Sequence, residues 1–452
     1  MDQPQSSDWR RYPFELVPGE DSQFVFPAAE GEHPDCESDT WFIAGELAAE
    51  DSGRKFAFLT IFNKNRIAGR FVADFYTLAL FDLDKGMYGT FTEYDVPPDN
   101  MRPDAVNKMS MTDGYLDIGF ACREGDATWQ ASRDEDGQLI PYTYDAVLVG
   151  RDQGGVPMEL RLHVTPTREP VALGASAYDG KFRCYGQDDT YSYFQTRMRM
   201  EGTLRWGDIE ETVTGDAGHV DRQWFPKYAA AGGPGGDPRS CSHEWRTINL
   251  DNGVDLSIWR QFDRPNRNAL QPFSGATTSE SGEAPECAED IEVSVYCYVR
   301  WPESIETLVP PPTVARWMPD RHRLTSRSLD LDLTGEPLVP APAHGLPIDY
   351  MEGPYRYRGT LRGKPVSGFA FYERTLAMHR DWELVDVLAS EDASLAEGVR
   401  PLIDAGRAAE AIEYLGEAEA SSPVAANVVD DLVTALRTSH PLESQASLAG
   451  DE

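Results

Sequence analysis

The sequence is poor in lysine and has few cysteines. Seven of its 452 residues are lysine, and 76 acidic against 41 basic residues give a formal net charge of -35. A surface of this sign repels phosphate, which argues against a nucleic acid partner and against docking on an anionic bilayer. The six cysteines include no CxxC pair and show no regular spacing, so they are expected to be reduced thiols and not ligands of a metal.

Long hydrophobic runs are also missing. No window approaches the roughly 18 apolar residues of a membrane span, and the first twenty residues contain no apolar core of a signal peptide. These absences predict a cytoplasmic protein without stable membrane insertion. The sequence also lacks the GxGxxG, Walker, HExxH and GxSxG motifs, so we expect no cofactor and no metal.

Strand-like segments are abundant. Short runs rich in aromatic and β-branched residues, such as KFAFLTIFN, recur between residues 40 and 385 and are separated by turn sequences such as DKG, TDG and LDNG. This pattern is typical of antiparallel strands joined by hairpins. It predicts an all-β sandwich or barrel, and the length predicts two domains, because single cores usually stop growing at roughly 250 to 300 residues.

Changes in composition suggest the domain boundaries. A stretch rich in glycine and proline, AAAGGPGGDPRS, reads as a linker, and the segment after residue 388 is rich in alanine with apolar residues at helical spacing. That segment predicts two amphipathic helices, which could pack on the barrels or mediate homo-oligomerisation; truncation there should leave ligand binding intact. The predicted parts are an N-terminal extension (1–35), a first β domain (36–228), the linker (229–240), a second β domain (241–388), a helical tail (389–440) and a disordered terminus (441–452).

Three segments combine aromatic and ionisable residues at unusual density. The first is GHVDRQW, residues 218–224. In a strand, His219, Asp221 and Gln223 share one face, whereas Arg222 and Trp224 share the other. The aligned histidine and aspartate could form an acid/base pair or a purely structural ion pair.

The second segment is SHEWR, which contains His243, Glu244 and Trp245 and leads through an LDNG hairpin to a strand with Trp259 and Arg260. Tryptophan and arginine on neighbouring strands can form a binding surface, and they also stack as structural filler of a barrel. Both readings remain open from the sequence.

The third segment begins at Tyr350 and continues to GFAFYE, which ends with Tyr372 and Glu373. Strand alternation places Tyr350 and Glu352 on one face. A carboxylate that faces the interior of a barrel is costly unless it is paired or protonated, which makes Glu352 and Glu373 candidates for a functional site.

In this order and spacing, the segments resemble the family of carotenoid 1,2-hydratases and AttH-like proteins, which are lipocalin-like and include fungal pericyclases of the Diels-Alderase type. The resemblance covers about residues 40 to 378. It rests on WFIAGEL (41–47), YSY followed by TR (191–197), GTL (202–204), DRQW (221–224), and the YMEG and GFAFYE segments (350–353 and 368–373).

The resemblance implies two tandem lipocalin-like (calycin-type) antiparallel β domains with a small helical extension, and a pocket near the domain interface. It also implies chemistry on a small hydrophobic molecule, an isoprenoid or polyene, without metal or organic cofactor. One position departs from the pattern: Arg222 stands where the hydratases have a histidine, which puts a catalytic histidine there in doubt. The neighbouring His219 could take its place.

The resulting hypothesis is a hydratase or cyclase that protonates an alkene. Asp221 and Glu373 are the first candidates for the acid, and His219 or His243 would polarise the acid or the water. The pocket is predicted where Asp221, Trp224, Trp245 and Glu373 converge. The residues expected to contact the substrate are Arg222, Trp224, Glu244, Trp245, Trp259, Glu352 and Tyr372.

Two alternatives remain: a non-catalytic carrier of a hydrophobic ligand, and a pericyclase that works by shaping a polyene. Carboxylates that point into the pocket without a partner would favour the hydratase. Carboxylates held in ion pairs around an apolar cavity would favour the carrier or the pericyclase.

Overall fold

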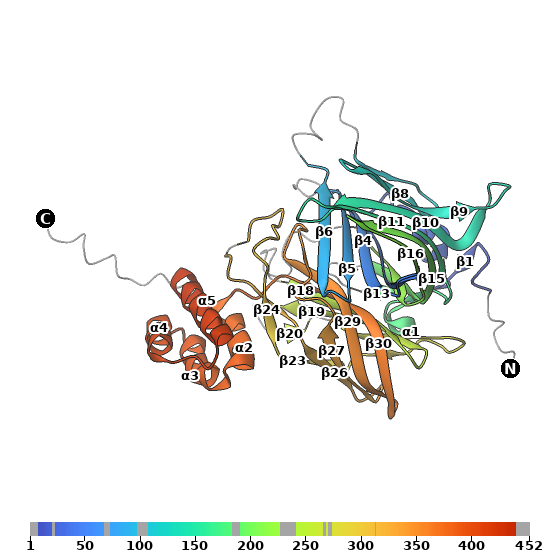
Figure 1. Cartoon of the computed structure of the whole chain (residues 1–452). Coiled ribbons are helices and arrows are strands. Elements are labelled where there is room, and N and C mark those ends of the chain that lie inside the picture. The colour runs from blue at the N-terminus through green and yellow to red at the C-terminus, as the bar shows by residue number, and fades with distance from the viewer. Residues whose placement is uncertain are drawn as a thin grey trace.

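The computed structural model describes residues 8–19, 23–66, 73–96, 107–182, 190–226, 241–264, 268–269, 274–311 and 313–439 (Figure 1). The predicted linker at 229–240 and the predicted disordered terminus at 441–452 lie outside these ranges. Two large curled sheets make up most of the molecule, and helices gather at one end of it. The predicted class, all-β with a helical extension, is confirmed.

The first sheet is antiparallel, and one face of its long strands points toward the second sheet. Its centre is β3, which pairs with β17 on one side and β4 on the other. The strands are β3 (Ser38–Ala49), β4 (Lys55–Asn65), β5 (Phe75–Asp82), β6 (Met87–Tyr94), β7 (Met109–Met111), β8 (Asp117–Cys122), β9 (Gly125–Arg133), β10 (Leu139–Arg151), β11 (Pro157–Pro166), β12 (Val171–Ala172), β13 (Lys181–Phe182), β14 (Thr190–Thr196), β15 (Met198–Trp206), β16 (Ile209–Gly215) and β17 (Gly218–Phe225). A short ribbon, β1 (Phe14–Glu15) with β2 (Val25–Phe26), precedes them.

The second sheet is also antiparallel, and its central strands follow the order β19, β18, β30, β29, β27. The strands are β18 (Cys241–Leu250), β19 (Val254–Asp263), β20 (Asn268–Ala269), β21 (Gly275–Glu280), β22 (Cys287–Ala288), β23 (Glu292–Val295), β26 (His322–Ser326), β27 (Leu331–Pro337), β28 (Ala343–His344), β29 (Tyr350–Leu361) and β30 (Lys364–Thr375). A separate ribbon is formed by β24 (Tyr298–Arg300) and β25 (Trp317–Pro319).

Four strands of the first sheet, β3, β4, β5 and β17, are buried on both faces. In β4, Phe56, Phe58 and Phe62 pack into the core of the first half-barrel, whereas Leu59 and Ile61 pack toward the second sheet. A strand covered on both sides needs apolar residues at consecutive positions, which is why the run KFAFLTIFN lacks polar alternation. The second sheet contributes side chains such as Phe369 and Phe371 to the same interface.

Polar contacts join the two sheets at the margins of this interface. Arg197 on the first sheet is 2.7 Å from the fully buried Asp255 of β19, and Arg168 is 3.1 Å from the same carboxylate. On another side, Thr90 of β6 lies 2.8 Å from the ring of His344 in β28. These contacts hold the facing sides of the sheets in a fixed relation, which is what a pocket between them requires.

The helical tail differs from its prediction. Two helices were expected from residue 389, whereas the described residues form short helices η1 (Ala28–Glu30) and α1 (Ala175–Tyr178) within the sheets and, in the tail, α2 (Asp381–Glu391), α3 (Ala393–Asp404), α4 (Ala408–Glu417) and α5 (Pro423–Ser439). The prediction missed α2, whose apolar Leu384 and Leu388 face the core shared by these helices. At the start of α2, the Glu383 carboxylate accepts hydrogen bonds from the backbone N–H groups of His379 and Arg380.

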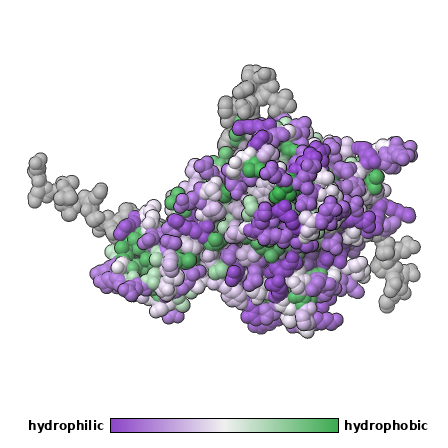
Figure 2. All heavy atoms as spheres, in the orientation of Figure 1, coloured by the Kyte–Doolittle hydropathy of each residue, from purple (hydrophilic) through white to green (hydrophobic). Residues whose placement is uncertain are grey.

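The tail packs against the second sheet and its ribbon. Glu383 pairs with Arg264 at 2.6 Å, both side chains being buried, and Trp317 of β25 donates to Asp431 of α5 at 2.9 Å. Figure 2 shows hydrophilic residues over much of one face of the molecule, as the acidic composition leads one to expect. None of the described helices is long and apolar enough to cross a membrane.

Candidate active site

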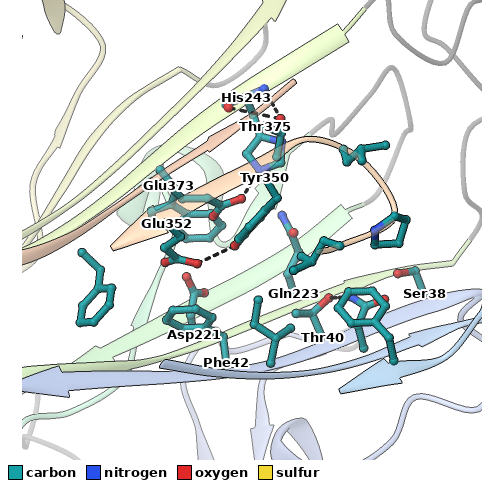
Figure 3. Close-up of a pocket in the computed structure, with 18 of the residues that line it drawn as sticks. Ser38, Thr40, Phe42, Asp221, Gln223, His243, Tyr350, Glu352, Glu373 and Thr375 are labelled. Carbon is teal, nitrogen blue, oxygen red and sulfur yellow. Dashed lines mark hydrogen bonds and ion pairs between the residues drawn. The ribbon is translucent and has the colours of Figure 1, made fainter. Parts of the chain in front are cut away.

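A pocket lies between the facing sides of the two sheets (Figure 3). The cavity measures about 200 Å³. Strands β3, β4, β5 and β17 line it from the first sheet, and β18, β29 and β30 line it from the second, together with the loop at 346–348. Along each long strand the lining residues are alternate ones, since successive side chains point to opposite faces.

On the first sheet, lining side chains form rows across neighbouring strands. Register places Asp221 of β17 opposite Phe42 of β3, and Phe42 opposite Ile61 of β4. His219 lies two residues from Asp221 on the same face of β17 and also lines the pocket. This row therefore presents one carboxyl group among apolar and aromatic side chains.

The second sheet faces this row with two glutamates. Register places Trp245 of β18 opposite Glu373 of β30, and Glu373 opposite Glu352 of β29. Figure 3 shows both glutamates on the side of the pocket that faces Asp221. Three carboxyl groups from three strands thus line one pocket.

Asp221 has the properties of a carboxylic acid held in its neutral form. Its residue is 9% exposed, and its Oδ1 atom has no hydrogen-bond partner among the described residues. Burial raises the pKa of Asp221 well above its ordinary value, and the negative charge of Glu373 raises this pKa further. A protonated carboxyl at this position can donate its proton to a bound molecule.

Glu352 and Glu373 lie directly opposite each other on adjacent strands. Two like charges at such positions repel, so the arrangement favours a proton on one of them. Burial, followed by the charge of Glu373, raises the pKa of Glu352 well above its ordinary value. Tyr350 donates a hydrogen bond to Glu352 at 2.6 Å and holds its carboxyl in place.

Glu373 is paired with a histidine. Its Oε1 atom lies 2.6 Å from Nε2 of His243, which comes from the neighbouring strand β18. The backbone N–H of His243 donates to the Thr375 hydroxyl at 3.0 Å, and its ring stacks on Trp259 with centroids 4.7 Å apart. These contacts fix the imidazole beside the carboxylate, so that a proton can pass between the two groups.

His219 remains neutral in this pocket. It is 4% exposed, and burial lowers its pKa to about 3. Its ring stacks on Phe42 with centroids 5.2 Å apart. A neutral imidazole can orient a polar group, but it cannot act as a cationic acid near neutral pH.

The pocket brings together some of the residues predicted from the sequence and leaves others outside. Those that line it are His219, Asp221, His243, Trp245, Glu352 and Glu373. Those that do not line it are Arg222, Trp224, Glu244, Trp259 and Tyr372. The predicted convergence of Asp221, Trp245 and Glu373 therefore appears in the structure, but Trp224 is not part of it.

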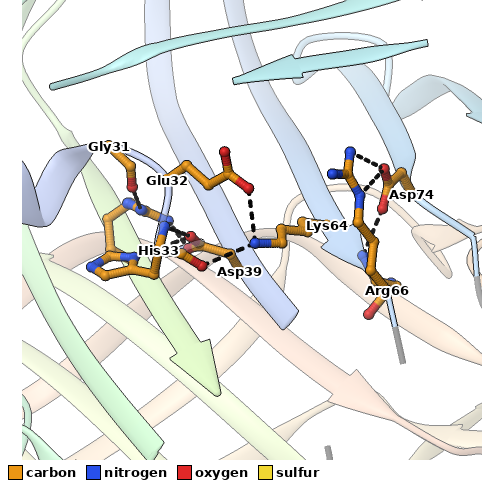
Figure 4. A network of polar contacts seen from close by, with 9 residues as sticks. Gly31, Glu32, His33, Asp39, Lys64, Arg66 and Asp74 are labelled. Atoms are coloured by element: carbon orange, nitrogen blue, oxygen red, sulfur yellow. Dashed lines mark hydrogen bonds and ion pairs between the residues drawn. The ribbon is translucent and has the colours of Figure 1, made fainter. Parts of the chain in front are cut away.

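Arg222 and Trp224 point into the first half-barrel, which corrects their expected place at the substrate. Arg222 donates to Asp39 at 2.8 Å and to the Gly31 carbonyl at 2.7 Å, and Trp224 stacks on the ring of His33 at 4.0 Å. Figure 4 shows the surrounding network, in which His33 also contacts Asp39. Burial raises the pKa of Asp39, but the charges of Arg222 and His33 outweigh it and lower this pKa.

Glu244 and Tyr372 point into the second half-barrel, because they occupy the alternate positions of β18 and β30. Glu244 pairs with Arg246 at 2.9 Å and with Arg260 at 2.8 Å, and Tyr372 donates to it at 3.2 Å. Burial alone would raise the pKa of Glu244, but the two guanidinium groups outweigh burial and lower it. A carboxylate so paired remains ionised and cannot serve as the acid.

Trp259 supports the pocket from behind. It is fully buried, contacts Trp245 with ring centroids 5.0 Å apart, and stacks on His243. Trp245 itself lines the cavity and is fixed by its indole N–H, which donates to Ser257 at 2.8 Å.

A polar row beside Asp221 was not predicted from the sequence. This row consists of Gln223, Thr40 and Asn63, which are opposite one another in the register of β17, β3 and β4. The alternation in GHVDRQW placed Gln223 on the face of Asp221, and an asparagine near the end of the apolar run KFAFLTIFN was a second signal.

The raised pKa of Asp221 predicts a pH dependence of stability. Because this pKa is higher in the folded than in the unfolded protein, the folded state holds an extra proton between the two values. The stabilisation that this proton gives the folded state is fully present below about pH 4. It is lost as the pH rises toward the folded pKa, and the free energy of unfolding falls by about 1.4 kcal/mol per pH unit. Asp221→Asn should remove this slope from urea unfolding free energies measured between about pH 5 and pH 8. Equal slopes in both proteins would mean that folded Asp221 is ionised.

The tail should be dispensable for ligand binding, because the described residues that line the pocket all lie at or before Thr375. The cut belongs before α2, at residue 381, and Arg264→Met should accompany it, since Arg264 would otherwise lose its buried partner Glu383. We expect unchanged binding by equilibrium dialysis. Lost binding in a variant whose near-UV circular dichroism is retained would contradict this prediction.

Comparison with known proteins bears on the same region of the chain. An AttH protein from Nitrosomonas europaea has a similar structure, with a TM-score of 0.54, 18% identity, and 80% of this chain and 99% of that chain covered. Kievitone hydratase from Nectria haematococca gives a TM-score of 0.54 at 14% identity, with 81% and 98% covered. A search of curated protein sequences finds no match. The model of the AttH-like family matches residues 17–375, and the chain therefore belongs to the AttH-like family.

Proposed function

We propose that this protein adds water to an alkene of an isoprenoid-like molecule by acid catalysis in the pocket between its two sheets. One observation carries the proposal: the inward-facing Asp221, whose Oδ1 has no partner among the described residues and whose pKa is raised by burial. An acid that is neutral yet poised in an apolar space suits the protonation of a carbon–carbon double bond. The name of kievitone hydratase, a protein of the same fold, describes a hydration.

The first step transfers the proton of Asp221 to the less substituted alkene carbon. The π electrons form the new C–H bond, and the positive charge develops on the more substituted carbon. Phe42, Phe371 and Trp245 line the pocket, and the negative faces of aromatic rings stabilise such a cation. Asp221 becomes a carboxylate beside the cation and stabilises it further.

The second step uses the Glu373–His243 pair. A water molecule donates its lone pair to the cationic carbon, and its proton passes to Glu373, which His243 holds at 2.6 Å. Returning this proton to Asp221 restores the starting state, because the two carboxyl groups face each other across the pocket. The net reaction consumes one alkene and one water and gives one alcohol.

A carrier of a hydrophobic ligand is the second candidate, and the pairing of Glu373 with His243 favours it. In that case the Glu373–His243 pair would fix the pocket walls without taking part in a reaction. Asp221 separates the two functions by what its proton does: in a carrier it would be shared with the ligand in a hydrogen bond, whereas in the hydratase it is transferred to carbon.

Isotope incorporation tests the proposed function. The full-length protein is incubated with acyclic isoprenoid alkenes in water labelled with heavy oxygen, and in a parallel sample in deuterium oxide. Hydration by this route should give an alcohol that contains one heavy oxygen, and one carbon-bound deuterium in the parallel sample, by mass spectrometry. Recovery of bound but unchanged alkene would favour the carrier and refute the hydratase.

A further inference from the structure

The polar row beside Asp221 is built into the floor of the pocket. Gln223 lies opposite Thr40, and Thr40 lies opposite Asn63, on three adjacent strands. In Figure 3, Thr40 and Gln223 lie on the first-sheet side of the pocket, next to Asp221 and Phe42. All three polar residues line the same cavity as the acid.

Two atoms of this row have no hydrogen-bond partner in the part of the chain that the structure describes. The Asn63 amide donates to the Thr40 hydroxyl at 2.6 Å, which leaves the Asn63 Oδ1 atom free to accept. The Gln223 Nε2 atom is a donor that is also without a partner among the described residues. Buried polar groups in native proteins are nearly always paired, so an acceptor and a donor left open on a pocket wall are positions where water or a polar group of a ligand can bind.

A hydroxyl group suits both positions. A hydroxyl has a proton that Asn63 Oδ1 can accept and lone pairs that can accept a hydrogen bond from Gln223 Nε2. The polar row is two residues along β17 from Asp221, which corresponds to about 7 Å at the rise of a strand. The hydroxyl and the double bond protonated by Asp221 would therefore be separated by about this distance.

The charge of the pocket limits the ligand further. Among the described residues that line it, none is lysine or arginine, and His219 is held neutral by burial. The other histidine of the pocket, His243, is paired with Glu373, so an anionic group would face three carboxyl groups and, among the described lining residues, no lysine or arginine. A diphosphate or a carboxylate is therefore disfavoured.

We propose that the substrate is a neutral alkene that carries a hydroxyl group about 7 Å from the reacting double bond, and that Gln223 and Asn63 bind this hydroxyl. The inference rests on the proposed function for the position of the double bond. The neutral hydroxyl group distinguishes this substrate from a hydrocarbon polyene and from an isoprenoid diphosphate. The binding of the hydroxyl can be measured independently of turnover.

The test compares geraniol with the hydrocarbon that lacks only its hydroxyl group. In geraniol, a spacer of comparable length separates the hydroxyl from the distal double bond. Binding is measured by headspace partitioning over the full-length protein carrying Asp221→Asn, so that no turnover occurs. We expect about tenfold tighter binding of geraniol, and loss of this preference on adding Gln223→Met. Gln130→Met, an exposed position on β9, is the matched control and should keep the preference.

Each outcome bears on the proposal. Equal affinity for the two probes, no measurable binding of geraniol, or a preference that survives Gln223→Met would overturn it, as would displacement of geraniol by geranyl diphosphate. If the preference holds but the protein with Asp221 intact incorporates no heavy oxygen, the proposed function fails and the hydroxyl site stands. If the hydrocarbon is hydrated and no preference exists, the hydroxyl site alone fails.

Discussion

Replacing Asp221 with asparagine should lower kcat/KM for hydration by about 10²- to 10⁴-fold, because an amide keeps the shape of the side chain but has no acidic proton to give. Binding of the alkene should persist, since the pocket is otherwise unchanged. The effect is measured as the initial rate of alcohol formation at saturating and limiting substrate. A loss in kcat without a rise in KM would place Asp221 at the chemical step.

Two further variants test whether this loss of activity is specific to the proposed catalytic groups. Glu373→Gln should also lower turnover strongly, because it removes the acceptor of the water proton. Glu30→Gln is the matched control: Glu30 is 3% exposed and burial raises its pKa to about 7, but it lies in the first half-barrel and does not line the pocket. If Glu30→Gln were as inactive as Asp221→Asn, the loss would reflect general disturbance of buried carboxyl groups and not catalysis.

The largest loss of stability is expected on breaking the buried pair of Arg222 and Asp39. The two side chains are 1% and 0% exposed and 2.8 Å apart. Arg222→Met would leave the Asp39 carboxylate buried with less compensation, and the free energy of unfolding should fall by about 3 to 5 kcal/mol. Urea unfolding followed by tryptophan fluorescence measures the change.

A double-mutant cycle isolates the pair. Arg222→Met combined with Asp39→Asn should be less destabilised than the sum of the two single variants. The control is Arg205→Met, which removes an exposed ion pair with Glu210 at 2.7 Å and should leave the free energy of unfolding nearly unchanged. Additive effects at Arg222 and Asp39 would show that the two side chains act independently and would contradict the structural role assigned to Arg222.

The sequence predicted the architecture because its signals are local. Hairpin turns and runs of aromatic residues are read directly from the chain, and alternation in GHVDRQW correctly separated the face of His219 and Asp221 from that of Arg222 and Trp224. The boundary of the tail was less accurate. Helix α2 begins only six residues after the end of β30, which leaves a short segment in which the period of the apolar residues changes.

The faces of the strands could not be assigned to the pocket from the sequence. Both faces of β17 are buried, one against the half-barrel core and the other against the second sheet, so burial alone does not tell Trp224 from Asp221. The same ambiguity placed Glu244 among the expected substrate contacts. The pairing of Glu373 with His243 depends on the register of strands that are 130 residues apart, which no local pattern specifies.

The protonation state of Asp221 tests the account most directly. Infrared difference spectroscopy between the wild type and Asp221→Asn isolates the carboxyl of this residue from those of Glu30 and Glu352, which are present in both proteins. We predict that the spectrum at about neutral pH shows the carbonyl band of a protonated carboxylic acid in the wild type only, because burial keeps this group neutral. A difference spectrum that contains only carboxylate bands at this pH would contradict the assignment of Asp221 as the acid.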